Sequence, residues 1–301
     1  MFKNVLVGVD GGPNGGDAIA LASRLIDPEG KLTLAHVDSA GLRPSGAVSP
    51  MLVRGEREAS EKLLQDERTT VGVDAELITI PALSPGAALH LQAEKQNADL
   101  LVVGSCSHGA FGRVMLGDDT RAALNGAPCA VAIASVGYAE HPAPLAKVGV
   151  AYNGSEESIA ALAMAHELAA QTKASVHALE VVSIPAYAFT GIVAPAIGDG
   201  IDEMIKEASG RMRELPDVEG RAVYGLTGEE LAAFGDQVDV LLVGSRSYGP
   251  IRRLVLGSTS DFLERHARCS LLVLPRASVV PSQGSPTAGA LPAVATAGVA
   301  V

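Results

Sequence analysis

An internal repeat constrains the fold of this chain more than any other feature of its sequence. The segment Asp99-Leu100-Leu101-Val102-Val103-Gly104-Ser105 returns 140 positions later as Asp239-Val240-Leu241-Leu242-Val243-Gly244-Ser245. Thirteen residues after the glycine of each copy stands another glycine, Gly117 in the first copy and Gly257 in the second. A chain of 301 residues is also long enough for two domains that each bury a core of their own. We therefore expect one α/β unit that occurs twice in tandem.

Five apolar runs alternate with helical patterns in each copy. The bulk of the 48% apolar residues is valine, leucine, isoleucine and alanine, which is typical of buried parallel strands covered by helices. The expected fold class is therefore α/β, with two tandem doubly wound five-stranded parallel sheets. The expected strands are residues 5–9, 32–37, 75–80, 99–103 and 129–134 in the first copy, and 148–152, 176–181, 221–224, 239–243 and 269–274 in the second. The helical patterns between them include residues 56–67, 86–96, 203–215 and 228–234.

These patterns also place the domain boundaries. The first unit is expected at residues 1–135, a linker at 136–147, the second unit at 148–276 and a tail at 277–301. Gly137, Pro142 and Pro144 predict that the linker is short and exposed. The tail contains no charged residue and no periodic apolar pattern, so we expect it to be disordered.

Composition narrows the classes of partner. The net charge of −11 argues against a nucleic acid, because such binding relies on clustered lysine and arginine. Cys106, Cys129 and Cys269 are odd in number and lack metal-ligand spacing, so we expect reduced thiols and no metal site. The first residues hold too short an apolar run for a signal peptide, and no stretch approaches the roughly 18 apolar residues of a membrane span. We expect a cytoplasmic protein without a membrane partner.

The turns after strands one and four of each copy are the expected ligand site, because open α/β sheets bind ligands beyond the carboxyl ends of their strands. In the second copy the turn after strand four runs Gly244-Ser245-Arg246-Ser247, and Gly257-Ser258-Thr259-Ser260 opens the next helix. Small residues let backbone amides approach a ligand closely, and a helix N-terminus attracts anions. The second copy therefore predicts a site for a small anion.

At these positions the sequence resembles the universal stress proteins in their tandem form. The nucleotide motif of that family is Gly, two residues, Gly, nine residues, then Gly followed by Ser or Thr, and the second copy supplies Gly244, Ser247, Gly257 and Ser258 at that spacing. The resemblance spans Val5 to Ala134 and Val148 to Pro275. It implies an adenine nucleotide alpha hydrolase-like fold and a site for ATP or a related adenine nucleotide, with Mg²⁺ left open.

The resemblance also implies how the two copies meet. Family dimers lead us to expect an internal pseudo-dimer with an approximate two-fold axis, since the short linker keeps the copies at high effective concentration. The expected contact joins the edge strands Ala130–Ala134 and Ser270–Leu274, because an exposed apolar edge is an association site. Further pairing of whole chains stays open.

The resemblance assigns nucleotide-binding roles residue by residue. In the second copy these fall on Asn153, Val181, Gly244, Ser245, Arg246, Ser247, Gly257, Ser258 and Thr259, and in the first on Asp10, Val37, Gly104, Ser107, Gly117 and Asp118. Both copies depart from the motif. Asn153 stands where the family has Asp, and Ser247 and Ser107 replace its middle Gly.

Asp118 is the departure with the largest consequence, because it stands where the motif has a hydroxyl. A carboxylate at a helix N-terminus repels a phosphate. We therefore expect the first site to be degenerate and ATP to bind in the second copy only. That copy also carries Arg246, Arg252 and Arg253 near the loop.

Three functions from different classes remain open. The first is a cytosolic stress-response module that binds ATP without dedicated catalysis, with weak ATPase activity not excluded. The second is a nucleotide-independent structural or interaction protein of the same fold. The third is an ATP-hydrolysing enzyme, but the turn Asp10-Gly11-Gly12-Pro13 lacks the Ser-Gly-Gly-x-Asp-Ser loop of ATP pyrophosphatases, and the chain has no GxxxxGK[ST] or GxGxxG motif.

The remaining reactive side chains are expected to be structural. His36 and His177 lie within strands and should pack there, and Cys129 and Cys269 should pack as small apolar residues. His108 lies two residues from Cys106, but nothing in the sequence supplies a third catalytic group. Scattered carboxylates such as Asp17, Asp27 and Glu140 should be solvated.

Overall fold

The computed structural model describes residues 1–38, 50–105, 118–142, 144–183, 194–245, 254 and 257–275. Several predicted residues lie outside these ranges, namely Cys106, Ser107, His108, Gly117, Arg246, Ser247, Arg252, Arg253 and the tail from 277. The elements of the first half are β1 (Phe2–Gly8), α1 (Pro13–Leu25), β2 (Ile26–Asp38), α2 (Pro50–Val71), β3 (Glu76–Pro81), α3 (Pro85–Gln96), β4 (Leu100–Gly104), α4 (Asp118–Leu124) and β5 (Ala130–Ala134). Those of the second half are β6 (Lys147–Ala151), α5 (Glu156–Thr172), β7 (Ser175–Val182), α6 (Ala194–Arg213), β8 (Glu219–Tyr224), α7 (Thr227–Phe234), a 3₁₀ turn (Gly235–Gln237), β9 (Val240–Gly244), α8 (Ser258–His266) and β10 (Ser270–Leu274).

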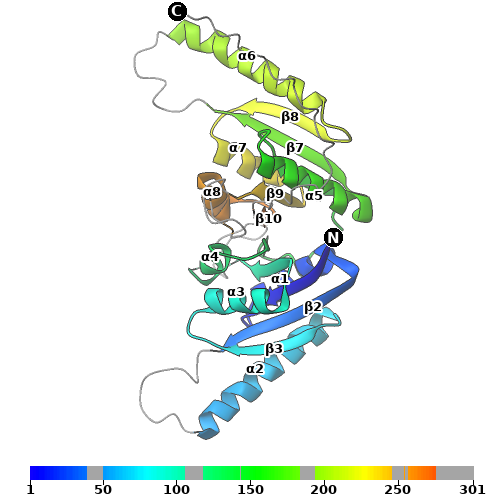
Figure 1. Cartoon of the computed structure of the whole chain (residues 1–301), viewed down its shortest axis with the longest axis vertical. Helices are drawn as coiled ribbons and strands as arrows, with labels where there is room; N and C mark the ends of the chain where they lie inside the picture. Colours follow the sequence, from blue (N-terminus) through cyan, green and yellow to red (C-terminus); the bar gives the residue numbers. More distant parts are fainter. Residues whose placement is uncertain are drawn as a thin grey trace, which may run out of the picture.

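The two predicted five-stranded sheets are confirmed, and they join edge to edge. One ten-stranded sheet has the order β3-β2-β1-β4-β5-β10-β9-β6-β7-β8. Its neighbours pair in parallel within each half, whereas β5 and β10 pair antiparallel. The halves lie end to end along the long axis, with α2 and α6 at opposite extremes (Figure 1).

The junction has an approximate two-fold axis, as expected for an internal pseudo-dimer. Ala132 pairs with Leu272 at its centre, and the flanking pairs are Ile133 with Leu271 and Val131 with Val273. Ala132 and Leu272 occupy the same place in the two repeats, since 272 minus 132 is 140. The axis therefore passes between two equivalent residues, and the predicted contact of the edge strands is confirmed.

Two apolar layers cover the sheet, and both continue across the junction. Alternate strand residues point to opposite faces, so Val5 and Val7 join one core whereas Leu6 joins the other. The first core receives buried side chains from α1, α2, α5 and α6. The second receives them from α3, α4, α7 and α8. Because each core contains strand residues of both halves, the halves share their hydrophobic interior.

Some elements begin earlier than the apolar pattern predicts. Strand β2 starts at Ile26, directly after α1, instead of at Leu32, and Ile26 pairs with Phe2 ahead of a register irregularity in β1. Helices α2 and α6 also begin earlier than the predicted Glu56 and Glu203. The pattern misses these starts because an apolar stripe marks only the part of an element that packs on the core.

The connection between the halves is mostly exposed, as the glycine and prolines predict, but Leu145 and Tyr138 pack against the core. Leu145 is 2% exposed, and burial raises the pKa of Tyr138 to about 12. Asp17 is also buried, so it is not the solvated carboxylate that we expected. Its two oxygens accept hydrogen bonds from the backbone amides of Gly137 and Ala139, at 2.8 and 2.7 Å. Helix α1 thereby holds the start of the connection against the first half.

Candidate functional site

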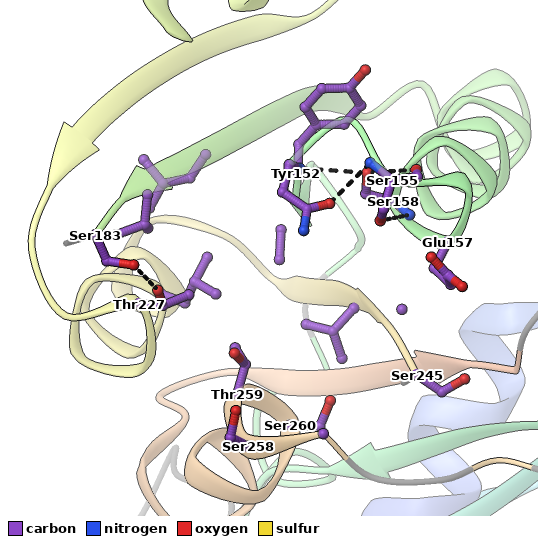
Figure 2. A pocket seen from close by; sticks show the side chains of 18 residues that line it. Tyr152, Ser155, Glu157, Ser158, Ser183, Thr227, Ser245, Ser258, Thr259 and Ser260 are labelled. Atoms are coloured by element: carbon purple, nitrogen blue, oxygen red, sulfur yellow. Dashed lines mark hydrogen bonds between the residues drawn. The ribbon is translucent and has the colours of Figure 1, made fainter. Parts of the chain in front are cut away.

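A cavity of about 700 Å³ opens at the carboxyl ends of β6, β7 and β9 in the second half (Figure 2). Strand β6 lies between β7 and β9, so the cavity is at the point where the strand order reverses. Seven of the predicted residues line it: Asn153, Val181, Gly244, Ser245, Gly257, Ser258 and Thr259. The other two, Arg246 and Ser247, lie outside the described residues.

The turn between β6 and α5 explains why asparagine can replace the family's aspartate. Asn153 Oδ1 accepts a hydrogen bond from the Ser155 amide at 3.1 Å, and Gly154 between them has a φ of +76°. In the first half, Asp10 Oδ1 accepts from the Gly12 amide at 2.9 Å in the same way. An amide oxygen closes this turn as well as a carboxylate does. The substitution therefore keeps the turn and removes a negative charge from the rim of the pocket.

Gly244 is required by the packing of a helix, whatever the pocket binds. A Cβ at this position would lie 2.6 Å from the Cβ of Glu157 in the first turn of α5. At the equivalent Gly104, a Cβ would lie 2.3 Å from the carbonyl oxygen of Asn14 in α1. Both distances are too short for any residue with a side chain, so these two glycines allow the helix after strand one to approach strand four.

Three helices begin at the pocket, and their N-termini differ in how they are capped. Ser155 caps α5, because its hydroxyl accepts a hydrogen bond from the Ser158 amide at 3.3 Å. Helices α7 and α8 have Leu226 and Gly257 at the N-cap, and neither residue provides a side-chain hydrogen bond. The first amides of a helix have no acceptor within the helix. The start of α8 therefore presents backbone donors and a positive dipole end to the pocket.

Hydroxyl groups form much of the pocket wall. Figure 2 shows Ser258, Thr259 and Ser260 at the start of α8 across the pocket from Ser155 and Ser158 of α5. On another side, the Thr227 hydroxyl donates to the Ser183 hydroxyl at 3.3 Å. Apolar contacts come from Val181, Leu231 and other residues, so one pocket combines an apolar wall with many small polar groups.

Few charges lie at the described part of the pocket. Glu157 is the charged residue among the described lining residues, and it is 9% exposed. Asp261 lies in the first turn of α8, where its charge opposes an anion, but Arg121 Nη2 lies 2.7 Å from its Oδ1. The wall can thus offer neutral donors to a ligand.

The first half carries a more negative rim at the equivalent place. Asp10 follows β1, Val37 lies near the end of β2, and Gly104 ends β4. Helix α4 begins at Asp118 just as α8 begins at Ser258, so Asp118 is the first helical residue of its helix. Glu67 of α2 approaches the same rim, since a Cβ on Gly15 would lie 3.7 Å from a carboxylate oxygen of both Asp10 and Glu67. Burial and then the negative charge of Asp10 raise the pKa of Glu67.

The sequence analysis did not identify several of these residues. Thr227 and Leu231 could have been found, because the helix after the third strand also begins at this rim. Glu67 gave no such signal, since its position depends on how α2 crosses the rim. Ser155 and Ser158 also line the pocket, and they could have been found because they follow strand one of the second copy.

The other candidates are structural. His36 Nδ1 lies 2.8 Å from the Val9 carbonyl oxygen. His177 Nε2 lies 2.7 Å from the Ser175 hydroxyl and its Nδ1 lies 3.4 Å from Glu219, an arrangement that superficially resembles a Ser-His-Glu triad. These three side chains lie at the amino ends of the strands, however, away from the pocket. A second cavity there is lined by His177 and Glu219 but not by Ser175.

The described residues contain no grouping of three or more His, Cys, Asp or Glu that could hold a metal ion. Cys129 and Cys269 are buried, and burial raises the pKa of each thiol to about 12, in agreement with a packing role. No helix within the described ranges is long and apolar enough to cross a membrane.

Comparisons with known proteins agree on one family. The model of the universal stress protein family matches residues 1–135 and again residues 145–275. A universal stress protein of Mycobacterium tuberculosis strain H37Rv is 27% identical over 216 residues, which cover 68% of this chain and 72% of that protein. A universal stress protein of Methanocaldococcus jannaschii is 24% identical over 141 residues, covering 43% of this chain and 82% of that one.

Solved structures share the fold across both halves. The crystal structure of a universal stress protein from Archaeoglobus fulgidus superposes with a TM-score of 0.62 at 18% identity, and the match covers 91% of this chain and 98% of that one. A universal stress protein from Pseudomonas aeruginosa superposes with a TM-score of 0.56 at 15% identity, covering 91% and 94%. Both cover the two halves together, so the tandem architecture has precedent among solved structures.

Proposed function

This chain belongs to the universal stress protein family, and from that premise we propose that it is a cytosolic stress-response module that binds ATP or a related adenine nucleotide in its second half. One observation carries the proposal. Seven of the nine predicted residues of the second copy line a single cavity of about 700 Å³, which is within the usual range of roughly 300–1,000 Å³ for small-molecule sites.

The two kinds of wall in this cavity suit the two ends of a nucleotide. Val181 and Leu231 would contact the adenosine through apolar surface, and Asn153 would offer its side-chain amide. Gly257, Ser258 and Thr259 would hold phosphates through backbone amides and hydroxyls at the start of α8. We propose that any Mg²⁺ arrives with the triphosphate, because proteins usually hold Mg²⁺ through substrate phosphates and not in an all-protein cage.

Binding without dedicated catalysis is the mode that the lining favours. The described lining residues include no lysine, arginine, histidine or cysteine, and their one carboxylate, Glu157, is buried. General acid–base catalysis needs a titratable group within hydrogen-bond reach of the reacting atoms. We therefore propose a sensor or partner module instead of an enzyme.

A nucleotide-independent interaction protein is the competing function. The observation in its favour is that Gly244 and Gly104 are accounted for by helix packing, since a Cβ at either position would collide with the neighbouring helix. These motif glycines would be kept even in a protein that binds no nucleotide.

Calorimetric titration of the full chain with ATP and Mg²⁺, followed by an assay for released phosphate, separates the functions. Binding without turnover supports the proposal, no binding supports the interaction protein, and multiple turnover supports an enzyme. Ser258→Asp should weaken ATP binding at least about tenfold, because two like charges about 4 Å apart repel by about 4 kcal/mol at an effective dielectric of 20.

Ser84→Asp is the matched control for Ser258→Asp. Ser84 is the exposed N-cap of α3 and lies outside the pocket, so the same charge change at another helix start should leave ATP binding unchanged. Undiminished binding in Ser258→Asp would show that the start of α8 does not hold the phosphates.

A further inference from the structure

The junction between the halves joins unlike side chains at equivalent positions. Arg121 and Asp261 are 140 residues apart, so they hold the same place in α4 and α8. Arg121 Nη2 donates to Asp261 Oδ1 at 2.7 Å across the junction. Under exact two-fold symmetry this position would face its own copy, so the sequence difference between the repeats creates the ion pair.

A second pair of equivalent positions also has its negative charge in the second half. Glu264 of α8 corresponds to Leu124 of α4, and both side chains are fully buried. Glu264 Oε2 lies 3.3 Å from the same Arg121 nitrogen, whereas its Oε1 has no hydrogen-bond partner among the described residues. A buried carboxylate is costly unless it is paired. The second half therefore brings two carboxylates to the junction, and the first half brings the cation.

The strand pair at the axis is also unequal. Ala132 of β5 pairs with Leu272 of β10, and both side chains belong to the same apolar core. In a pair of first halves, alanine would face alanine and leave a gap in the core. In a pair of second halves, leucine would face leucine and overfill the same place. The sizes of the central side chains and the charges beside them therefore both favour a pairing of two unlike halves.

We propose that the junction surface of each half is selective for the other half and rejects a second copy of itself. The partner that fits the first half is a surface with two carboxylates and a large central side chain, which the second half of this chain provides. A first-half pair would bring Arg121 against Arg121. A second-half pair would crowd four carboxylates, two of them buried. The backbone pairing of two edge strands cannot discriminate by itself, so these side chains set the choice.

Single substitutions in the full chain recreate the rejected pairs. Arg121→Asp places a carboxylate against Asp261 and Glu264, and Asp261→Arg places arginine against arginine. Both variants should lower the melting temperature by several degrees and speed amide hydrogen exchange in β5 and β10 by about tenfold or more. The double variant Arg121→Asp/Asp261→Arg restores an unlike pair and leaves Glu264 one helical turn from the introduced arginine on the same helix. It should recover a clear part of both losses but not all, because Arg265, which lies 3.6 Å from Asp261, loses its partner in the double variant.

Lys31 and Glu76 provide the matched control, because their ion pair joins β2 and β3 at 2.6 Å within the first half. Lys31→Glu and Lys31→Glu/Glu76→Lys should change exchange in β5 and β10 by less than about twofold, since an exposed pair contributes little. If both junction singles fail to fold, recovery of a folded double variant still supports the selectivity. If the losses of the two singles simply add in the double variant, or if no loss occurs, the proposal is wrong.

Discussion

A methyl group on Gly244 would lie 2.6 Å from the Cβ of Glu157, so strand β9 and helix α5 meet at a separation that only glycine allows. This contact belongs to the scaffold of the pocket. A motif glycine can be required because a ligand approaches the backbone closely or because a helix does, and at Gly244 the helix is sufficient reason.

Gly244→Ala should therefore destabilise the protein with no ligand present. We expect a loss of about 1–3 kcal/mol in the free energy of unfolding, because extra volume in a packed contact forces the backbone to shift. Gly210→Ala is the control, since a Cβ on Gly210 in α6 would meet no atom within 4 Å. That change should stabilise the helix by about 0.5–1 kcal/mol. Urea denaturation measures both, and equal stability of the Gly244→Ala variant and the parent would contradict the packing argument.

Asp17→Asn should loosen the connection between the halves. The two oxygens of Asp17 accept from the amides of Gly137 and Ala139, and asparagine has a single acceptor oxygen for them. One backbone amide then loses its charged acceptor, at a cost of about 1–3 kcal/mol in unfolding free energy. Glu140→Gln, at an exposed residue of the same segment, should change stability by less than about 0.5 kcal/mol. Denaturant melts of the two variants should differ clearly, and equal stabilities would rule out this role for Asp17.

Glu264→Gln should change how stability depends on pH. Burial raises the pKa of Glu264 from 4.5 to about 7, although Arg121 lowers it in part. Between these values the folded protein binds a proton that the unfolded chain releases, so this group stabilises the fold at low pH and loses that contribution as the pH rises toward 7. The difference corresponds to about 3 kcal/mol, at about 1.4 kcal/mol per pKa unit.

Glutamine mimics the protonated acid, so the variant should match the parent near pH 4.5 and be the more stable protein above pH 7. Unfolding free energies measured from pH 4.5 to 8 test this expectation. A difference between variant and parent that stays constant over that range would mean that Glu264 does not titrate there.

Removing negative charge from the first half should create a second nucleotide site. We expect one ATP per chain in the parent, and Asp118→Ser should move the stoichiometry toward two because the start of α4 would then resemble the start of α8. Adding Glu67→Gln should strengthen the new site, since Glu67 and Asp10 place two carboxylates at the same rim. Calorimetry gives the stoichiometry directly.

Asp74→Ser is the control for this series, because it removes one negative charge at an exposed position after α2. It should leave the stoichiometry at one. Two equal sites in the parent would show that the carboxylates of the first half do not exclude a nucleotide.

The sequence by itself determined the repeating architecture. Continuous apolar runs and the helical stripes between them specify five strands and their helices in each half, because buried strands and half-buried helices leave different local patterns. The fixed offset between repeats identifies Ala132 and Leu272 as equivalent positions, and the small residues after strand four predicted which rim carries the pocket. Such features depend on residues near one another in the chain, so a pattern can reveal them.

Only the tertiary structure decided which distant side chains meet. Arg121 and Asp261 look like ordinary surface charges in the sequence, yet they form an ion pair that joins the two halves. Asp17 looks like a solvated carboxylate, yet it binds the backbone of the segment that connects the halves. Glu67 reaches the rim of the first site because helix α2 crosses the sheet at an angle that no local period encodes. These contacts depend on strand order and helix packing, and both are set by the burial of whole faces.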